Sequence, residues 1–143
     1  MKKIILIGAG GHARSCIDII TNTKKYKIEY LFEKKESKNL ISYKKLVYNK
    51  ENLSRIKKKI KLAFICFGQI KNRVGRQNVY EELKKIGFNF PVIISKSSYV
   101  SNNSKILGGT IIMHKTVINS NVKIGHNNII NTGSIIEHDV SVG

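Results

Sequence analysis

The residue types near the carboxyl end of the chain suit proton transfer. The segment Glu137-His138-Asp139 places one imidazole between two carboxylates. A carboxylate in contact with a histidine orients the ring and stabilises the imidazolium, which is what a general base requires. Asp139 is the expected partner of His138 if its side chain turns back toward the ring. A solvent-exposed histidine on a turn is the alternative, and the residues alone leave both open.

A second candidate site is the glycine-rich segment Gly8-Ala9-Gly10-Gly11-His12-Ala13, which lies between an apolar run and a helical pattern. Glycines let a backbone approach a phosphate, and a helix N-terminus offers it free N–H groups. The spacing departs from the dinucleotide fingerprint because Ala13 stands in place of the third glycine. Phosphate binding and a plain tight turn both remain possible. The candidate ligand-binding residues of this segment are Gly8, Gly10, Gly11 and His12.

Further candidates follow the other apolar runs of the first 90 residues. Glu33 ends the second run, and an acidic residue there commonly meets ribose hydroxyls. Gly68 and Gln69 end the third run, and Arg73 and Arg76 follow it. In an open parallel sheet these positions meet at the carboxyl edge of the strands, where ligands bind. We therefore expect them to share one binding region with the glycine-rich segment.

Three histidines, His114, His126 and His138, are spaced by twelve residues, which suggests a metal array. The period of the surrounding sequence argues against one. In a coil of three hexads, twelve residues are two thirds of a turn, so the three side chains point to three faces. A metal requires ligands that converge on one point. We therefore expect no metal site.

The elements that position His138 form an internal repeat. From Ile94 onward an aliphatic residue returns every six positions, and a small or slim residue follows four places after each. A period of six fits neither a helix nor a simple strand but suits short strands joined by turns, three to a coil. An ordinary β-sandwich is the alternative, and eight hexads in phase favour a left-handed parallel β-helix. The aliphatic positions are Ile94, Val100, Ile106, Ile112, Ile118, Ile124, Ile130, Ile136 and Val142.

The first part of the chain alternates strand and helix patterns, which is typical of an α/β unit with a parallel sheet. We expect a Rossmann-like half domain over residues 1–92 and the first coils of a β-helix over 93–143, since the composition shifts near Pro91. Half a doubly wound domain is too small for a whole dinucleotide, which disfavours an NAD-dependent oxidoreductase. Expected strands cover residues 3–7, 28–32 and 62–67, and expected helices cover 13–23 and 70–86.

The formal charge of +17 indicates either attraction to anionic ligands or a lysine-rich solvated surface. The lysines are spread along the chain without interleaved aromatic residues, which disfavours nucleic acid. Cys16 and Cys66 lie in apolar stretches without motif spacing, so we expect buried free thiols in a reducing cytoplasm. No segment is long enough to span a membrane, and we read the apolar start as a buried strand rather than a signal peptide.

Three segments together resemble the sugar acetyltransferases of the sialic-acid O-acetyltransferase and UDP-4-amino-sugar N-acetyltransferase family. They are Ile5-Leu6-Ile7-Gly8-Ala9-Gly10-Gly11-His12-Ala13, the strand end Phe67-Gly68, and Asn131-Thr132-Gly133-Ser134-Ile135-Ile136-Glu137-His138-Asp139. The resemblance covers essentially the whole chain, and the pairing of both halves is more specific than either half.

This resemblance implies an acetyl-CoA-dependent transfer to an amino or hydroxyl group of a sugar nucleotide or a sialic-acid-like sugar. The N-terminal unit would bind the sugar nucleotide, with the loop from Gly8 to His12 in contact. His138 would be the base, assisted by Asp139, without a metal. Acetyl-CoA would lie between neighbouring β-helices of a homotrimer, with contacts at Asn131 and Ser134.

Members of the family continue for several coils beyond the segment matching Gly143. Those coils carry most acetyl-CoA contacts and a second functional histidine. We therefore expect a C-terminally truncated form with weak or no acetyl transfer, even if sugar-nucleotide binding survives. A non-catalytic module for sugar-nucleotide binding or assembly is the main alternative. The residues do not choose between an amine and a hydroxyl acceptor.

Overall fold

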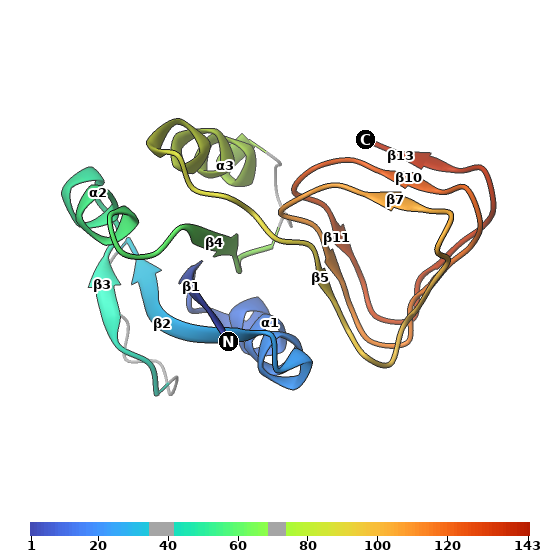
Figure 1. The fold of residues 1–143 in the computed structure, drawn as a ribbon, viewed down its shortest axis with the longest axis horizontal. Coiled ribbons are helices and arrows are strands. Elements are labelled where there is room, and N and C mark those ends of the chain that lie inside the picture. The colour runs from blue at the N-terminus through green and yellow to red at the C-terminus, as the bar shows by residue number, and fades with distance from the viewer. Residues whose placement is uncertain (35–41, 69–73) are drawn as a thin grey trace. The chain divides into compact units, whose positions relative to one another are not determined.

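The computed structural model describes residues 1–34, 42–68 and 74–143. The chain forms two compact units, Met1–Phe90 and Pro91–Gly143 (Figure 1). The division lies two residues before the boundary expected from the composition. The expected fold class is confirmed, because a parallel α/β unit is followed by a left-handed parallel β-helix.

The first unit is built on a parallel sheet with the strand order β3-β2-β1-β4. Helix α1 lies on one side of the sheet, and α2 and α3 lie on the other (Figure 1). The sequence patterns did not indicate β3 or α2, because these elements are short and their apolar positions few. The elements are β1 (Lys2–Ile7), α1 (Gly11–Thr23), β2 (Tyr26–Glu33), β3 (Lys45–Val47), α2 (Lys50–Lys57), β4 (Leu62–Ile65) and α3 (Val74–Ile86).

The core of this unit follows from the apolar runs in β1 and β4. Ile5 and Ile7 alternate with Ile4 and Leu6, so β1 is buried on both faces, as a central parallel strand requires. Ile5 and Ile7 belong to a cluster with Leu53 of α2 and with Val79 and Leu83 of α3. The packing fixes the carboxyl ends of the strands relative to the helices that begin beside them.

The second unit consists of two-residue strands, each paired in parallel with the strand eighteen residues further on, as in Ile93↔Ile111↔Ile129. Three hexads therefore complete one coil. The aliphatic residues that recur every six positions form the interior cluster, with Ile112, Ile118 and Ile124 almost completely buried. The strands are β5 (Ile93–Ile94), β6 (Tyr99–Val100), β7 (Lys105–Ile106), β8 (Ile111–Ile112), β9 (Val117–Ile118), β10 (Lys123–Ile124), β11 (Ile129–Ile130), β12 (Ile135–Ile136) and β13 (Ser141–Val142).

The corners of the coils repeat a backbone conformation as regularly as the strands do. From Gly109 to Asp139, one residue in every hexad has a positive φ, between 53° and 82°. Asparagine, aspartate and glycine occupy most of these positions, since they tolerate the left-handed region best. Threonine hydroxyls close the corners from inside: Thr116 Oγ1 donates to the Met113 carbonyl and, across coils, to that of Asn131. The corner residues are Gly109, Lys115, Asn121, Asn127, Gly133 and Asp139.

Candidate functional site

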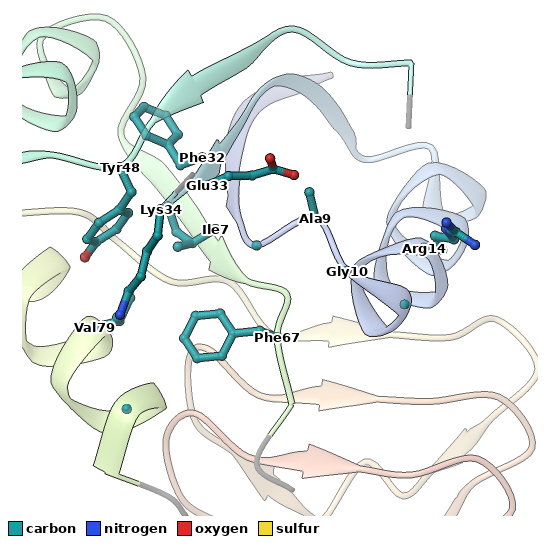
Figure 2. Close-up of a pocket in the computed structure, with 13 residues that line it drawn as sticks. Ile7, Ala9, Gly10, Arg14, Phe32, Glu33, Lys34, Tyr48, Phe67 and Val79 are labelled. Atoms are coloured by element: carbon teal, nitrogen blue, oxygen red, sulfur yellow. The ribbon is translucent and has the colours of Figure 1, made fainter. Parts of the chain in front are cut away.

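The first unit contains a cavity of about 520 Å³ at the carboxyl edge of its sheet (Figure 2). Residues at or just beyond the ends of all four strands line it, together with the glycine-rich segment and α3. This is the edge at which open parallel sheets bind ligands. The lining residues are Ile7, Gly8, Ala9, Gly10, Gly11, Arg14, Phe32, Glu33, Lys34, Tyr48, Phe67, Gly75 and Val79.

The glycine-rich segment forms a tight turn into the first helix. Gly8 has a φ of +103°, and a Cβ there would lie 3.3 Å from the Cβ and Cδ1 atoms of Phe67. Its N–H donates to the Phe32 carbonyl at 2.8 Å, which joins the loop to the end of β2. Gly10 precedes α1 without a side-chain cap, and the first turn of α1 carries no acidic residue. The helix N-terminus therefore offers its N–H groups and partial positive charge to an anion in the cavity.

Two ionisable side chains from the end of β2 face the same cavity. Figure 2 shows the Glu33 carboxylate directed toward the loop at Ala9, and the Lys34 side chain directed toward α3 at Val79. Phe67 and Tyr48 add aromatic surface to the wall. Tyr48 is fixed by a hydrogen bond from its hydroxyl to Glu82 Oε2 at 2.7 Å. Burial of the ring and the nearby Glu82 carboxylate raise the pKa of Tyr48 well above its ordinary value.

The predicted substrate-binding residues do not all belong to the described lining of the cavity. Gly8, Gly10, Gly11 and Glu33 line the cavity, whereas the described lining includes neither His12 nor Gly68. Gln69 and Arg73 lie outside the described residues. The sequence patterns missed Lys34, Tyr48 and Phe67. Phe67 directly precedes the recognised Gly68, and Lys34 directly follows Glu33, so both could have been inferred from the strand ends.

Arg76 lies near the carboxyl edge of the sheet, as predicted, but its guanidinium donates hydrogen bonds to the protein backbone instead of facing the cavity. The residue is 1% exposed, and its Nη1 donates to the carbonyl oxygens of Ile65 at 3.0 Å and of Phe67 at 2.6 Å. Burial lowers the pKa of Arg76 to about 10, at which the group still carries its charge at neutral pH. Arg76 therefore fixes the chain leaving β4, including the Phe67 wall of the cavity.

A thiol pair lies beneath the glycine-rich segment. Cys16 and Cys66 are free and buried, as expected. The neighbouring Cys66 thiol, and to a smaller extent His12, lowers the pKa of Cys16, whereas burial raises the pKa of Cys66. His12, in the first turn of α1, is half-buried.

In the β-helix, His138 contacts Asp139. The His138 Nδ1 lies 2.7 Å from Asp139 Oδ2, and both side chains are largely exposed. This hydrogen bond and the adjacent charge raise the pKa of His138, and the same hydrogen bond lowers the pKa of Asp139. Glu137 accepts a hydrogen bond from Asn119 Nδ2 at 2.8 Å. Of the two neighbouring carboxylates, Asp139 is therefore the one that orients the ring.

The predicted cofactor-binding residues lie one hexad before His138, on the turn that leads into β12. The N–H of Ser134 donates to the Asn131 carbonyl at 3.1 Å, which closes this turn. Asn131 is exposed and Ser134 is half-buried. The Asn131 side chain is therefore presented to solvent at the corner of the coil that precedes the corner of the candidate base.

The three evenly spaced histidines follow strands of three different sheets, β8, β10 and β12. His114 Nδ1 lies 2.7 Å from Ser95 Oγ, and His126 Nδ1 lies 3.2 Å from the Gly108 carbonyl oxygen. Across the part of the chain that the structure describes, no group of three His, Cys, Asp or Glu residues is arranged to hold a metal ion. Likewise, none of its described helices is long and apolar enough to cross a bilayer.

The family of the PglD N-terminal domain matches residues 3–83 of the chain, which therefore belongs to that family. Solved structures match nearly the whole chain. One is a histidine-to-alanine mutant of GDP-perosamine N-acetyl transferase from Caulobacter crescentus in complex with CoA and GDP-perosamine. It has a TM-score of 0.87 and 22% identity, over 99% of this chain and 65% of that one.

A second similar structure is the acetyltransferase domain of PglB from Neisseria gonorrhoeae FA1090 in complex with acetyl coenzyme A. It has a TM-score of 0.85 and 23% identity, and the match covers 98% of this chain and 66% of that one. The chain thus spans about two thirds of the length of these proteins. At such identities the likeness establishes the two-unit fold.

Proposed function

We propose that this protein is an acetyl-CoA-dependent sugar acetyltransferase that acts on a sugar nucleotide in the cytoplasm. The observation that carries the proposal is the oriented pair of His138 and Asp139 on the β-helix. The cavity behind the glycine-rich segment, in a domain of the PglD N-terminal family, supports the choice of substrate class. The named activities and ligands of the similar structures support the reaction.

In the proposed reaction, His138 Nε2 removes a proton from the acceptor as the acceptor attacks the thioester carbonyl carbon of acetyl-CoA. Backbone N–H groups of a coil would stabilise the oxyanion. When the carbon–sulfur bond breaks, the proton on His138 passes to the departing thiolate. General-base assistance of this kind contributes about 10²–10⁴-fold to the rate. An amine acceptor is favoured over a hydroxyl because the Caulobacter relative is named for N-acetyl transfer.

The sugar-nucleotide half of the proposal depends on the chemistry of the cavity. The N–H groups at the start of α1, which has no side-chain cap, suit the diphosphate, and Glu33 suits the hydroxyl groups of a ribose. We propose a UDP- or GDP-linked amino sugar, or a sialic-acid-like sugar. The co-substrate acetyl-CoA would lie against Asn131 and Ser134, between β-helices of a homotrimer.

The test combines calorimetric titration with a transfer assay. Wild-type protein is titrated with UDP-sugars, GDP-sugars and acetyl-CoA, and acetyl transfer is measured for wild type and His138→Ala. We expect both ligands to bind, and turnover to fall by about 10²–10⁴-fold in the variant while the fold is retained. Wild-type turnover in His138→Ala would contradict the assignment of the base.

A binding module without catalysis is the second candidate. The observation that favours it is the cavity, whose described lining residues all belong to the first unit. Binding of a sugar nucleotide without binding of acetyl-CoA would support the module over the enzyme. Sedimentation of the protein over a range of concentrations tests the trimer.

A further inference from the structure

We propose that Asn121 is a positioning residue that holds Asp139, and through it the His138 ring, in the orientation required of a general base. This inference rests on the proposed function for its catalytic consequence, but its structural part is independent. No feature of the sequence segment around His138 identifies Asn121, which lies eighteen residues earlier.

The β-helix brings the two residues together because they occupy the same corner of successive coils. Asn121 and Asp139 both have left-handed backbones, with φ values of 60° and 63°. The Asp139 N–H donates to the Ser120 carbonyl at 3.1 Å, which ties the two corners together beside the side chains. Two residues with the same backbone conformation, one coil apart, project their side chains in the same direction. Contact between them is therefore a consequence of the repeat.

The contact uses the carboxylate oxygen that His138 leaves available. Asn121 Nδ2 donates to Asp139 Oδ1 at 2.5 Å, while Asp139 Oδ2 lies 2.7 Å from His138 Nδ1. Asp139 is 63% exposed, so packing does little to restrict its side chain. One hydrogen bond leaves a carboxylate able to rotate, whereas two bonds to its two oxygens fix both its position and its plane.

The fixed carboxylate in turn selects the protonation state of the ring. A carboxylate only accepts hydrogen bonds, so Asp139 favours the His138 tautomer with its proton on Nδ1. That tautomer leaves the Nε2 lone pair free to take a proton from an acceptor. The Asn121 donor also helps to keep Asp139 ionised, since it is the second cause of the lowered pKa of that carboxyl. The charged groups beside the ring are Asp139 and Glu137.

The same coils contain a matched control. Asn119 Nδ2 donates to Glu137 Oε2 at 2.8 Å, again across eighteen residues and again on the surface. This pair has the same chemistry and the same position in the stack of coils, but its carboxylate does not hold the ring. Loss of the Asn119 hydrogen bond should therefore perturb the surface of the coils as much as loss of the Asn121 hydrogen bond does. It should leave the tautomer of His138 almost unchanged.

The experiment measures the His138 ring directly by ¹⁵N NMR, with its signals identified by their loss in His138→Gln. Three variants are compared with wild type. Asn121→Gly removes the donor and keeps the corner, because glycine adopts a φ near 60° freely. Asn121→Asp keeps the size and the backbone preference but replaces the donor with an acceptor. Asn119→Ala is the control.

We expect wild type and Asn119→Ala to hold the proton on Nδ1, and both Asn121 variants to become tautomeric mixtures. In Asn121→Gly the pKa of His138 should fall toward its ordinary value, since the Asp139 bond is less often formed. Acetyl transfer in that variant should show kcat reduced by about tenfold at unchanged KM. Unchanged tautomer and pKa in Asn121→Gly would overturn the proposal, as would wild-type behaviour of Asn121→Asp.

The positioning role of Asn121 and the proposed function are tested by different measurements. If the NMR spectra change as expected while wild-type protein binds neither a sugar nucleotide nor acetyl-CoA, the positioning by Asn121 is supported and the proposed function is wrong. If wild type is active and the spectra of Asn121→Gly do not change, the reaction stands and the positioning role is wrong.

Discussion

The cavity of the first unit and the histidine pair of the second unit are assembled in different ways. The cavity draws its lining from all four strand ends and from two helices, between Ile7 and Val79. The pair is made within one hexad and supported from the equivalent hexad one coil earlier. The cavity therefore depends on tertiary packing between distant segments, whereas the histidine pair depends on the regular six-residue repeat. Substitutions should therefore affect the two sites through different residues.

The largest expected effect is the loss of stability caused by a substitution in the interior of the β-helix. The side chains that recur every six residues fill this interior. Ile118 is completely buried among the aliphatic residues that recur every six positions. Ile118→Ala should lower the free energy of unfolding by about 2–5 kcal/mol, because the coils cannot close around the missing side chain. Urea unfolding monitored by circular dichroism measures the change.

Ile135→Ala is the matched control, since Ile135 is 65% exposed on the adjacent strand β12. We expect that variant to remain within about 0.5 kcal/mol of wild type. Equal losses in the two variants would mean that the six-residue period does not determine which side chains are interior.

The next largest effect is expected in the first unit, at the buried arginine beneath the cavity wall. Arg76→Met fills similar space but leaves the carbonyl oxygens of Ile65 and Phe67 without their shared donor. We expect a loss of about 2–4 kcal/mol in the free energy of unfolding. Sugar-nucleotide affinity should also fall, because Phe67 lines the cavity.

The exposed Arg55 provides the comparison. Its Nη2 donates to Asn52 on the surface of α2. Arg55→Met should change neither the stability nor the affinity measurably. If Arg76→Met were as mild as Arg55→Met, the cavity wall would not depend on the buried guanidinium.

The sequence predicted the second unit better than the first, because a repeat is encoded locally and tertiary packing is not. Each hexad carries its own aliphatic residue, so the position of His138 on a corner could be predicted from the period alone. Even the separation of the three histidines follows from twelve being two thirds of a coil. The role of Asn121 could not be predicted from the local sequence, because its partner Asp139 lies eighteen residues away at the equivalent corner of the next coil.

In the first unit the strand ends could be predicted, and with them Gly8, Gly10 and Glu33. Lys34 and Phe67 directly adjoin these strand ends, whereas no local pattern indicated Tyr48 or the internal role of Arg76. Tyr48 follows the three-residue strand β3, which no periodicity marks. Arg76 lies near the edge that the sequence predicts, but its burial and its carbonyl partners depend on how α3 packs on β4. Such contacts join distant segments, and no local pattern encodes them.

A smaller effect is expected from substitutions in the glycine-rich segment, where Gly8 should matter for stability and Gly10 for ligand binding. Gly8→Ala forces a side chain onto a φ of +103° and against Phe67, so we expect a loss of about 1–3 kcal/mol in stability. Gly10 has an extended backbone with a φ of −78°, and nothing lies within 4 Å of an added Cβ. Gly10→Ala should therefore retain stability while weakening sugar-nucleotide binding, because the new methyl group would occupy the approach to the helix N-terminus.

Thermal unfolding and calorimetric titration of both variants give the two quantities. Full affinity in Gly10→Ala would show that the loop is a tight turn rather than a phosphate site. The segment left both interpretations open, and this pair of variants decides between them.

The smallest effect is a shift in the pH dependence of acetyl transfer. The hydrogen bond to Asp139, and then its charge, raise the pKa of His138 above the ordinary 6.5. A general base acts in its neutral form, so kcat/KM should increase with pH through this raised pKa. In Asp139→Asn the carboxylate charge is lost, and the rising limb should move to lower pH, with a lower plateau because the ring is less well oriented. In Glu137→Gln, which removes only a minor cause of the raised pKa, the limb should hardly move. Profiles of wild type and the two variants test this order, and a larger displacement in Glu137→Gln than in Asp139→Asn would assign the orienting carboxylate to Glu137.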